Sequence, residues 1–121
     1  MRRLAWVLIL VACFAGGATG AMSTTRFTQK PRPRWLPRIW WAIGMCETGL
    51  NWRHHSSSYQ GAFGFYSGSW DQFKPAGYPA EAYEATPWQQ YQVALRIWRR
   101  YGFSGWGCYT GGGYRYWLAR A

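Results

Sequence analysis

Carboxylates are scarce in this chain of 121 residues, which has 14 Lys and Arg side chains against 4 Asp and Glu. One of the four acids, Glu47, directly follows Cys46 and lies within the aromatic-rich stretch MCETGLNW. Neighbouring aromatic rings exclude water from a carboxyl group, and this desolvation raises its pKa. A carboxyl group with a raised pKa can deliver a proton at neutral pH, so Glu47 is a candidate general acid. The alternative is an ordinary surface glutamate at the end of a helix.

Two cysteines remain outside the N-terminal segment of the chain, Cys46 and Cys108. In an exported protein of this size, such a pair most simply forms one disulfide. A redox-active or metal-binding pair is the alternative, but the sequence has neither the Cys-x-x-Cys spacing nor a cluster of histidine ligands. His54 and His55 are adjacent, so their side chains point apart, and a solvated turn is the simpler interpretation. We therefore predict no metal and no cofactor.

The first 20 residues have the pattern of a signal peptide: Arg2 and Arg3, then the apolar run LAWVLILVACF, then small residues. This segment is too short and too glycine-rich at its end to span a membrane stably. We expect cleavage near Gly20 and export of the mature chain. The alternative is a lipoprotein site in LVAC, which would leave the protein anchored through Cys13.

Without the signal peptide, 12 basic and 4 acidic residues remain, so the mature chain is strongly cationic. For an exported protein, such a surface suits anionic cell-wall polymers or membrane lipids better than nucleic acid, and plain solubility is the alternative. The 10 Trp and 9 Tyr residues exceed what one small core can bury. Some rings are therefore expected at the surface, where they can stack on sugar faces.

A mostly helical domain is expected to position Glu47. Residues 21–36 are basic, contain proline and have few apolar side chains, which predicts an extended linker. A first helix is expected to begin at Pro37, because proline is tolerated in the first turn, and to end at Glu47, before Gly49. The stretch that follows is rich in Ser, Gly and aromatic residues with weak alternation, which favours a small hairpin.

Two further helices are expected after the hairpin. Ser67 can cap a short helix, and Thr86 with Gln89 forms a capping box for a longer one. The predicted apolar face of the longer helix comprises Gln90, Val93, Ala94, Ile97, Trp98 and Tyr101. Residues 111–121, which begin with three glycines, are expected to form a basic aromatic tail. The predicted domain therefore covers residues 37–110, without internal repeats.

Four motifs together resemble one known family: CETGLNW, SYQGAFGFYSGSW, QQYQVALRIW and GFSGWGC. They are similar to the catalytic domain of the resuscitation-promoting factors, within the lysozyme-like superfamily that includes lytic transglycosylases. The GAFG segment also resembles the glycine-rich strand of goose-type lysozymes and lytic transglycosylases. The resemblance covers about residues 37–110. It implies a small lysozyme-like α+β fold that is mostly α-helical, with a minor β hairpin and one disulfide.

The resemblance also implies roles for individual residues. Glu47 matches the catalytic glutamate, Tyr59 matches an aromatic residue that lines the sugar cleft, and Ser69 matches a substrate-contacting threonine. Gln90 matches a glutamine in the last helix. The full set of predicted substrate-binding residues is Trp52, Tyr59, Phe63, Ser69, Trp70 and Gln90. Gly64 departs from the family, which usually has a substrate-contacting glutamine at this position.

The activity implied by the resemblance is cleavage of the MurNAc-GlcNAc β-1,4 bond of peptidoglycan. Glycosidic cleavage usually needs two carboxylates, about 5 to 5.5 Å apart for retention or about 6.5 to 9.5 Å apart for inversion. Asp71 is expected to decorate a short helix, and Glu81 and Glu84 lie in a surface stretch rich in Pro and Ala. A lytic transglycosylase needs Glu47 alone, because the 6-hydroxyl of N-acetylmuramic acid supplies the nucleophile.

Two other functions stay open at this point. A binding module would hold wall glycan without turning it over, which Gly64 and the aromatic wall favour. A cationic, Trp- and Arg-rich protein acting on membranes would use the linker and the tail. For the enzyme, we expect a secreted or wall-associated monomer that acts on peptidoglycan glycan strands and has no stable transmembrane segment.

Overall fold

The computed structural model describes residues 28–121; the predicted signal peptide, Cys13 and the first part of the predicted linker lie outside the described residues. Along the chain come the helix α1 (Arg38–Thr48), the strands β1 (Tyr59–Gln60) and β2 (Phe65–Tyr66), and the helices α2 (Ser67–Phe73), α3 (Pro87–Tyr101), α4 (Gly107–Thr110) and α5 (Tyr114–Leu118). Two short 3-10 turns, η1 (Ala82–Glu84) and η2 (Gly102–Gly105), flank α3. The predicted fold is confirmed, because the domain is mostly helical with one antiparallel hairpin and one disulfide. None of the helices that the structure describes is long and apolar enough to cross a membrane.

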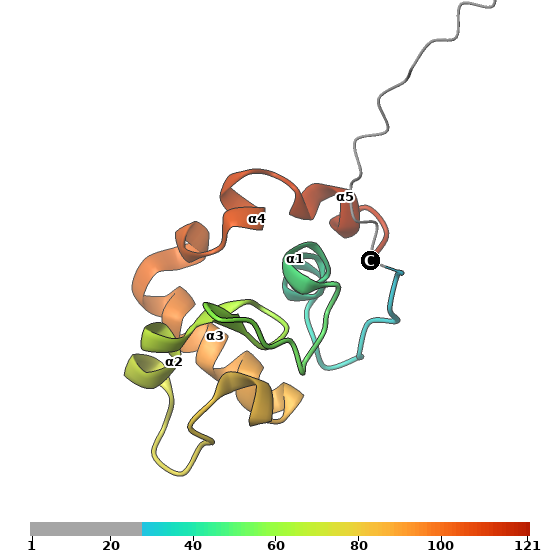
Figure 1. Cartoon of the computed structure of the whole chain (residues 1–121). Coiled ribbons are helices and arrows are strands. Elements are labelled where there is room, and N and C mark those ends of the chain that lie inside the picture. The colour runs from blue at the N-terminus through green and yellow to red at the C-terminus, as the bar shows by residue number, and fades with distance from the viewer. Residues whose placement is uncertain (1–27) are drawn as a thin grey trace, which may run out of the picture.

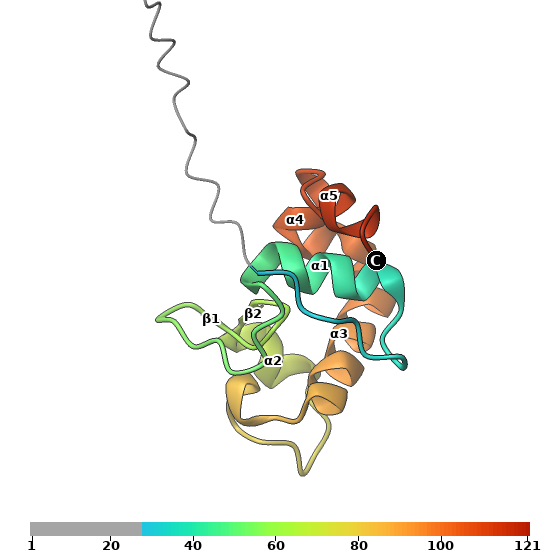
Figure 2. The ribbon, with the colours of Figure 1, turned by 90° about the vertical axis from the view of Figure 1, so that its right-hand side faces the viewer.

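Helix α1 runs through the middle of the domain, with α4 and α5 on one side of it and α3 and the hairpin on the other (Figure 1, Figure 2). It begins after Pro37, as predicted, and apolar side chains face both sides. Trp40 and Trp41 are therefore only 3% and 1% exposed. Gly49 ends the helix in the left-handed conformation, with φ 69°. Glu47 is thus held in the last turn of a buried helix.

Helix α3 begins with the predicted capping box. The Thr86 hydroxyl accepts a hydrogen bond from the N–H of Gln89, and the Gln89 side chain accepts one from the N–H of Thr86. As predicted, the buried face of the helix includes Gln90, Val93, Ala94 and Ile97. The prediction is wrong for Trp98 and Tyr101, which are 40% and 49% exposed. The last turn of α3 extends past the core, so the side chains of Trp98 and Tyr101 are exposed to solvent.

The hairpin pairs Tyr59 with Tyr66 and Gln60 with Phe65 in antiparallel register. Helix α2 follows β2 without a connecting residue. Ser67, predicted to cap α2, is instead its first helical residue, and Tyr66 occupies the N-cap position without a side-chain hydrogen bond. A direct strand-to-helix transition leaves no separate position for a capping residue.

Both ends of the described chain pack on the domain. Leu36, within the predicted linker, is fully buried, and the indole N–H of Trp41 donates to the carbonyl of Lys30 at 3.0 Å. The predicted tail contains α5, where Trp117 packs edge-on against Trp41 with ring centroids 6.1 Å apart. These contacts join segments that are distant in sequence. Local composition therefore does not reveal that they are ordered.

Candidate active site

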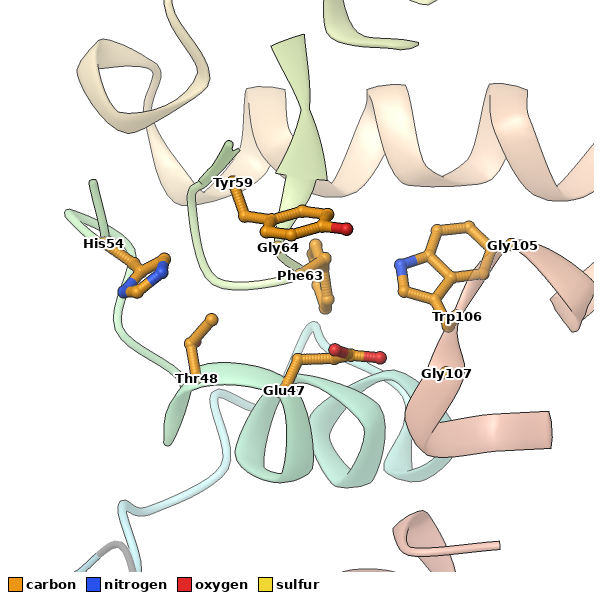
Figure 3. Close-up of a pocket in the computed structure, with 9 residues that line it drawn as sticks. All are labelled: Glu47, Thr48, His54, Tyr59, Phe63, Gly64, Gly105, Trp106 and Gly107. Atoms are coloured by element: carbon orange, nitrogen blue, oxygen red, sulfur yellow. The ribbon is translucent and has the colours of Figure 1, made fainter. Parts of the chain in front are cut away.

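Glu47 lies in a cavity of about 290 Å³, the acid cavity, between α1, the hairpin and the turn before α4 (Figure 3). This cavity is lined by Glu47, Thr48, His54, Tyr59, Phe63, Gly64, Gly105, Trp106 and Gly107. A second hollow of about 330 Å³ adjoins it, because both are lined by Tyr59, Gly64, Gly105 and Trp106. The acid cavity and the second hollow together form one groove, a concave surface of the kind that binds a ligand.

Glu47 is half-buried, and one of its carboxyl oxygens is already engaged by the protein. Its Oε1 accepts a hydrogen bond from the backbone N–H of Cys108 at 3.0 Å. Burial raises the pKa of Glu47 above its ordinary value of 4.5, and the Cys108 N–H offsets part of this rise. An oxygen that accepts from an N–H is not the one that carries the acid proton. The proton therefore belongs on Oε2, the oxygen nearer to Gly64.

Three aromatic rings stand around the Glu47 carboxyl group (Figure 3). Tyr59, which is 54% exposed, overhangs the cavity, while Phe63 and Trp106 line it and are almost wholly buried. Trp106 is not among the predicted substrate-binding residues. His54 also lies at the cavity, although the histidine pair predicted a solvated turn. These rings exclude water on several sides, which is the physical cause of the raised pKa of Glu47.

The disulfide holds the hydrogen-bond donor of Glu47 in place. Cys46 and Cys108 are bonded, with Cα atoms 5.9 Å apart, so the predicted pairing is confirmed. Cys46 precedes Glu47 in α1, and Cys108 lies in α4. The same covalent link that joins the two helices therefore brings the Cys108 N–H to the carboxylate.

The sequence pattern of the Transglycosylase-like domain family matches residues 37–109, from the start of α1 into α4. The chain belongs to the transglycosylase-like domain family. The predicted resemblance is thereby confirmed, and the groove belongs to a lysozyme-like enzyme that acts on peptidoglycan. A comparison with curated proteins finds no match.

In this transglycosylase-like domain, Gly64 keeps the acid cavity open. Its φ of 62° lies in the left-handed region that favours glycine. A Cβ atom at this position would stand 3.8 Å from Oε2 of Glu47, which is ordinary contact distance. Because Gly64 has no side chain, nothing at this position covers Oε2, whereas the resembling family usually has a glutamine here.

Three of the six predicted substrate-binding residues lie in the groove of this domain, namely Tyr59, Phe63 and Ser69. Trp52 lines a separate hollow, and its ring packs edge-on against Phe63. Trp70 is 1% exposed, packs against Phe65, and lines neither part of the groove. Trp52 and Trp70 thus lie behind the aromatic wall and support it.

Gln90 also lies outside the groove and is fully buried, which differs from the expected contact with substrate. Its Nε2 donates to the carbonyls of Trp52 at 2.8 Å and Ala85 at 3.1 Å. Its Oε1 accepts from the N–H of Ala62 at 2.9 Å, and the Ala62 carbonyl in turn accepts from the Thr48 hydroxyl at 2.7 Å. The amide is fully used within the protein, so Gln90 positions the segment that lines the acid cavity.

The other three acidic side chains of this domain lie away from the groove. Asp71 pairs at 3.3 Å with a lysine one turn further along the chain, Glu81 accepts a hydrogen bond from Gln60, and Glu84 is exposed in the separate hollow. None of the three lines the acid cavity or the second hollow. Within residues 28–121, no group of three or more His, Cys, Asp or Glu is placed to hold a metal ion. The groove therefore contains one carboxyl group.

Proposed function

We propose that this protein is a lytic transglycosylase that cleaves the β-1,4 bond between N-acetylmuramic acid and N-acetylglucosamine in peptidoglycan. Family membership supports action on peptidoglycan. The observation that carries the finer proposal is a groove with a single carboxyl group, Glu47, whose pKa is raised by burial. Most glycosidases use two carboxylates, whereas a lytic transglycosylase takes its nucleophile from the substrate.

In the first step, Oε2 of Glu47 gives its proton to the glycosidic oxygen. The bond between this oxygen and C1 of the muramic acid then breaks, its electron pair stays on the oxygen, and the leaving sugar departs with a free 4-hydroxyl. Positive charge develops at C1 and the ring oxygen. The Cys108 N–H supports this step, because it stabilises the carboxylate that Glu47 becomes.

In the second step, the Glu47 carboxylate takes the proton of the 6-hydroxyl on the same muramic acid. The freed oxygen attacks C1 and closes a 1,6-anhydro ring, which restores the acid form of Glu47. The attack is intramolecular, so it gains the rate advantage of two reacting groups held together. Burial of the site by Phe63 and Trp106 also limits competition from water.

The open side of the groove offers contacts for sugar rings. Tyr59 is exposed and borders both the acid cavity and the second hollow, so its ring is available to stack on a sugar face. The hydroxyl of Ser69 borders the second hollow beside it. We further propose that the protein is exported and works at the cell wall, as its N-terminal sequence and its cationic balance favour.

The test is the product formed from purified peptidoglycan by the wild type and by Glu47→Gln. We expect the wild type to release muropeptides with 1,6-anhydro ends, which mass spectrometry identifies because they are lighter than hydrolysed ends by one water. Glu47→Gln keeps the size of the side chain but removes the proton, so release should fall by about 10²- to 10⁴-fold. Glu84→Gln is the matched control, because Glu84 is exposed and outside the groove.

Each alternative gives a different result. Hydrolysed reducing ends would show that water, rather than the 6-hydroxyl, attacks C1. Undiminished release by Glu47→Gln would remove Glu47 from the mechanism. Binding of glycan by the wild type without any release would identify a binding module.

A further inference from the structure

The second hollow is the end of the groove that extends away from Glu47. Its lining contains aromatic, aliphatic and neutral polar side chains and no charged one. Helices α2 and α3 lie side by side here (Figure 1) and supply Phe73, Ile97 and Tyr101 to the lining. The charge at this end of the groove is therefore set by the residues on its rim.

Two arginines of α3 stand on that rim. Arg96 and Arg100 are one helical turn apart on α3, so they lie on the same face of the helix. Each directly precedes a residue that lines the second hollow, Ile97 or Tyr101, so this face adjoins the hollow. Nη1 of Arg96 donates to the carbonyl of Phe73 at 3.4 Å. The guanidinium carbon of Arg100 lies 5.1 Å from the centre of the Tyr101 ring. Both guanidinium groups thus contact residues that line the second hollow.

Neither guanidinium group is paired with an acidic side chain in the part of the chain that the structure describes. Within residues 28–121, the ion pair formed is that of Lys74 with Asp71, and Asp71 does not line the hollow. An arginine side chain carries five N–H donors. Arg96 makes one long hydrogen bond to the domain, so most of its donors, and those of Arg100, remain exposed to solvent. The rim therefore consists of two solvent-exposed guanidinium groups, one helical turn apart, that have no acidic partner among the described residues.

We propose that the Arg96–Arg100 rim binds a carboxylate of the peptide stem that muramic acid carries, so that the groove selects glycan strands with stems over bare strands. This inference rests on the proposed function. The sugar backbone of peptidoglycan is uncharged, and its stems bear carboxylates. Arginine suits this partner because its planar fork binds a carboxylate through two parallel hydrogen bonds.

Arg99 offers a matched control on the same helix. It has the same charge and is also exposed, but its charge acts on Tyr91, where burial raises the pKa of the phenol and Arg99 partly offsets the rise. Tyr91 packs with Trp35, Trp40 and Trp88 and lines neither part of the groove. A change at Arg99 therefore removes one charge from α3 without touching the rim.

The experiment measures binding of full-length Glu47→Gln protein, which does not consume its ligand, to two preparations of the same glycan strands. One keeps its peptide stems. The other has been stripped of them by an amidase, and the lactyl carboxyl groups that this hydrolysis frees on muramic acid have then been converted to neutral methylamides. The double change Arg96→Gln, Arg100→Gln should weaken binding to stem-bearing strands on the order of tenfold, with the loss shrinking at high salt, because two exposed charge contacts are removed. Binding to stripped strands should stay the same, and Arg99→Gln should change neither.

Equal losses on both preparations, or no loss on either, would overturn the proposal. So would a loss confined to a soluble phosphodiester polymer, measured as a third ligand, because that result would assign the rim to an anionic wall polymer. The proposed function can fail separately. Stem-selective binding by a wild type that releases no product would support the role of the rim and contradict the proposed enzymatic activity. Turnover by the wild type at equal rates on both preparations would support the proposed enzymatic activity and contradict the role of the rim in stem recognition. Thermal unfolding of each variant checks that the fold is intact.

Discussion

The backbone N–H of Cys108 donates to Oε1 of Glu47 at 3.0 Å across 61 positions of sequence. Cys108 is also bonded to Cys46, the residue before Glu47. A disulfide and a hydrogen bond therefore connect the same two short segments. Because the donor is a main-chain group, its position depends on how firmly α4 is held to α1.

Removing this link should weaken both the fold and the site. For Cys46→Ser with Cys108→Ser, we expect the free energy of unfolding to fall by about 2 to 4 kcal/mol, since the unfolded chain regains the freedom that the disulfide removes. The Cys108 N–H should then hold Glu47 less firmly, so kcat should fall on the order of tenfold at a temperature where the variant is still folded. Denaturant unfolding and muropeptide release measure the two effects. An unchanged kcat would show that the rest of α4 suffices to place the donor.

The dependence of activity on pH should follow Glu47. Its pKa is raised above 4.5, chiefly by burial, and the first step needs the protonated form. Activity is therefore fully present below the pKa of Glu47 in the folded protein and is lost as pH rises through it. The midpoint of this loss in kcat/KM should lie above pH 4.5. A midpoint at or below that value would show that Glu47 does not act as the acid.

A methyl group at position 64 should move that midpoint upward. In Gly64→Ala, the new Cβ would lie 3.8 Å from Oε2 of Glu47 and displace water from the charged form. Alanine is strained at the positive φ of position 64, so the substitution should also lower the free energy of unfolding by about 1 to 2 kcal/mol. Gly77→Ala is the control, because Gly77 has φ 84° and nothing within 4 Å of an added Cβ. It should lower the stability similarly and leave the pH profile unchanged; a shift in both variants would assign the effect to loss of stability.

The buried amide of Gln90 should matter for stability more than for substrate affinity. Gln90→Leu keeps a similar volume but leaves one N–H and two carbonyls without their partner, so we expect a loss of about 3 kcal/mol or more. Gln92→Leu, on a half-buried position of the same helix, should change stability by about 0.5 kcal/mol or less. Denaturant unfolding gives both values. A normal stability with a raised KM for Gln90→Leu would instead place this side chain in contact with substrate.

Local sequence signals predicted the elements that depend on local chemistry. Pro37 and Gly49 bound the first helix, and the capping box at Thr86 starts the long one, because each signal acts through neighbouring backbone groups. The sequence also predicted a desolvated Glu47, but the rings that line its cavity, Tyr59, Phe63 and Trp106, lie outside the MCETGLNW stretch. The identity of the hydrogen-bond donor of Glu47 was not predicted, since no local pattern marks a backbone N–H that arrives from 61 residues away.

Three of the predicted substrate-binding residues lie outside the groove, and their placement has one physical cause. Gln90, Trp70 and Trp52 have the residue types of sugar-binding side chains, but their burial is decided by packing between distant segments. Gln90 in particular bonds to groups as far as 38 residues away. His54 lies in the connection between α1 and β1, and Trp106 lies between η2 and α4. Both line the acid cavity, but neither connection has a composition that marks it as part of a site.

The packing of α5 sets the size of the unit that can be produced as a stable fragment. The family match ends at residue 109, yet Trp117 covers one edge of Trp41, and the Lys30 carbonyl receives the indole N–H of the same ring. A fragment trimmed to residues 37–109 would lack Trp117 and Lys30, and it would therefore expose a large apolar surface on α1 to solvent. We expect such a fragment to self-associate on size-exclusion chromatography, whereas residues 28–121 should elute as a single monomeric species. Expression boundaries for this protein should accordingly keep both flanking segments.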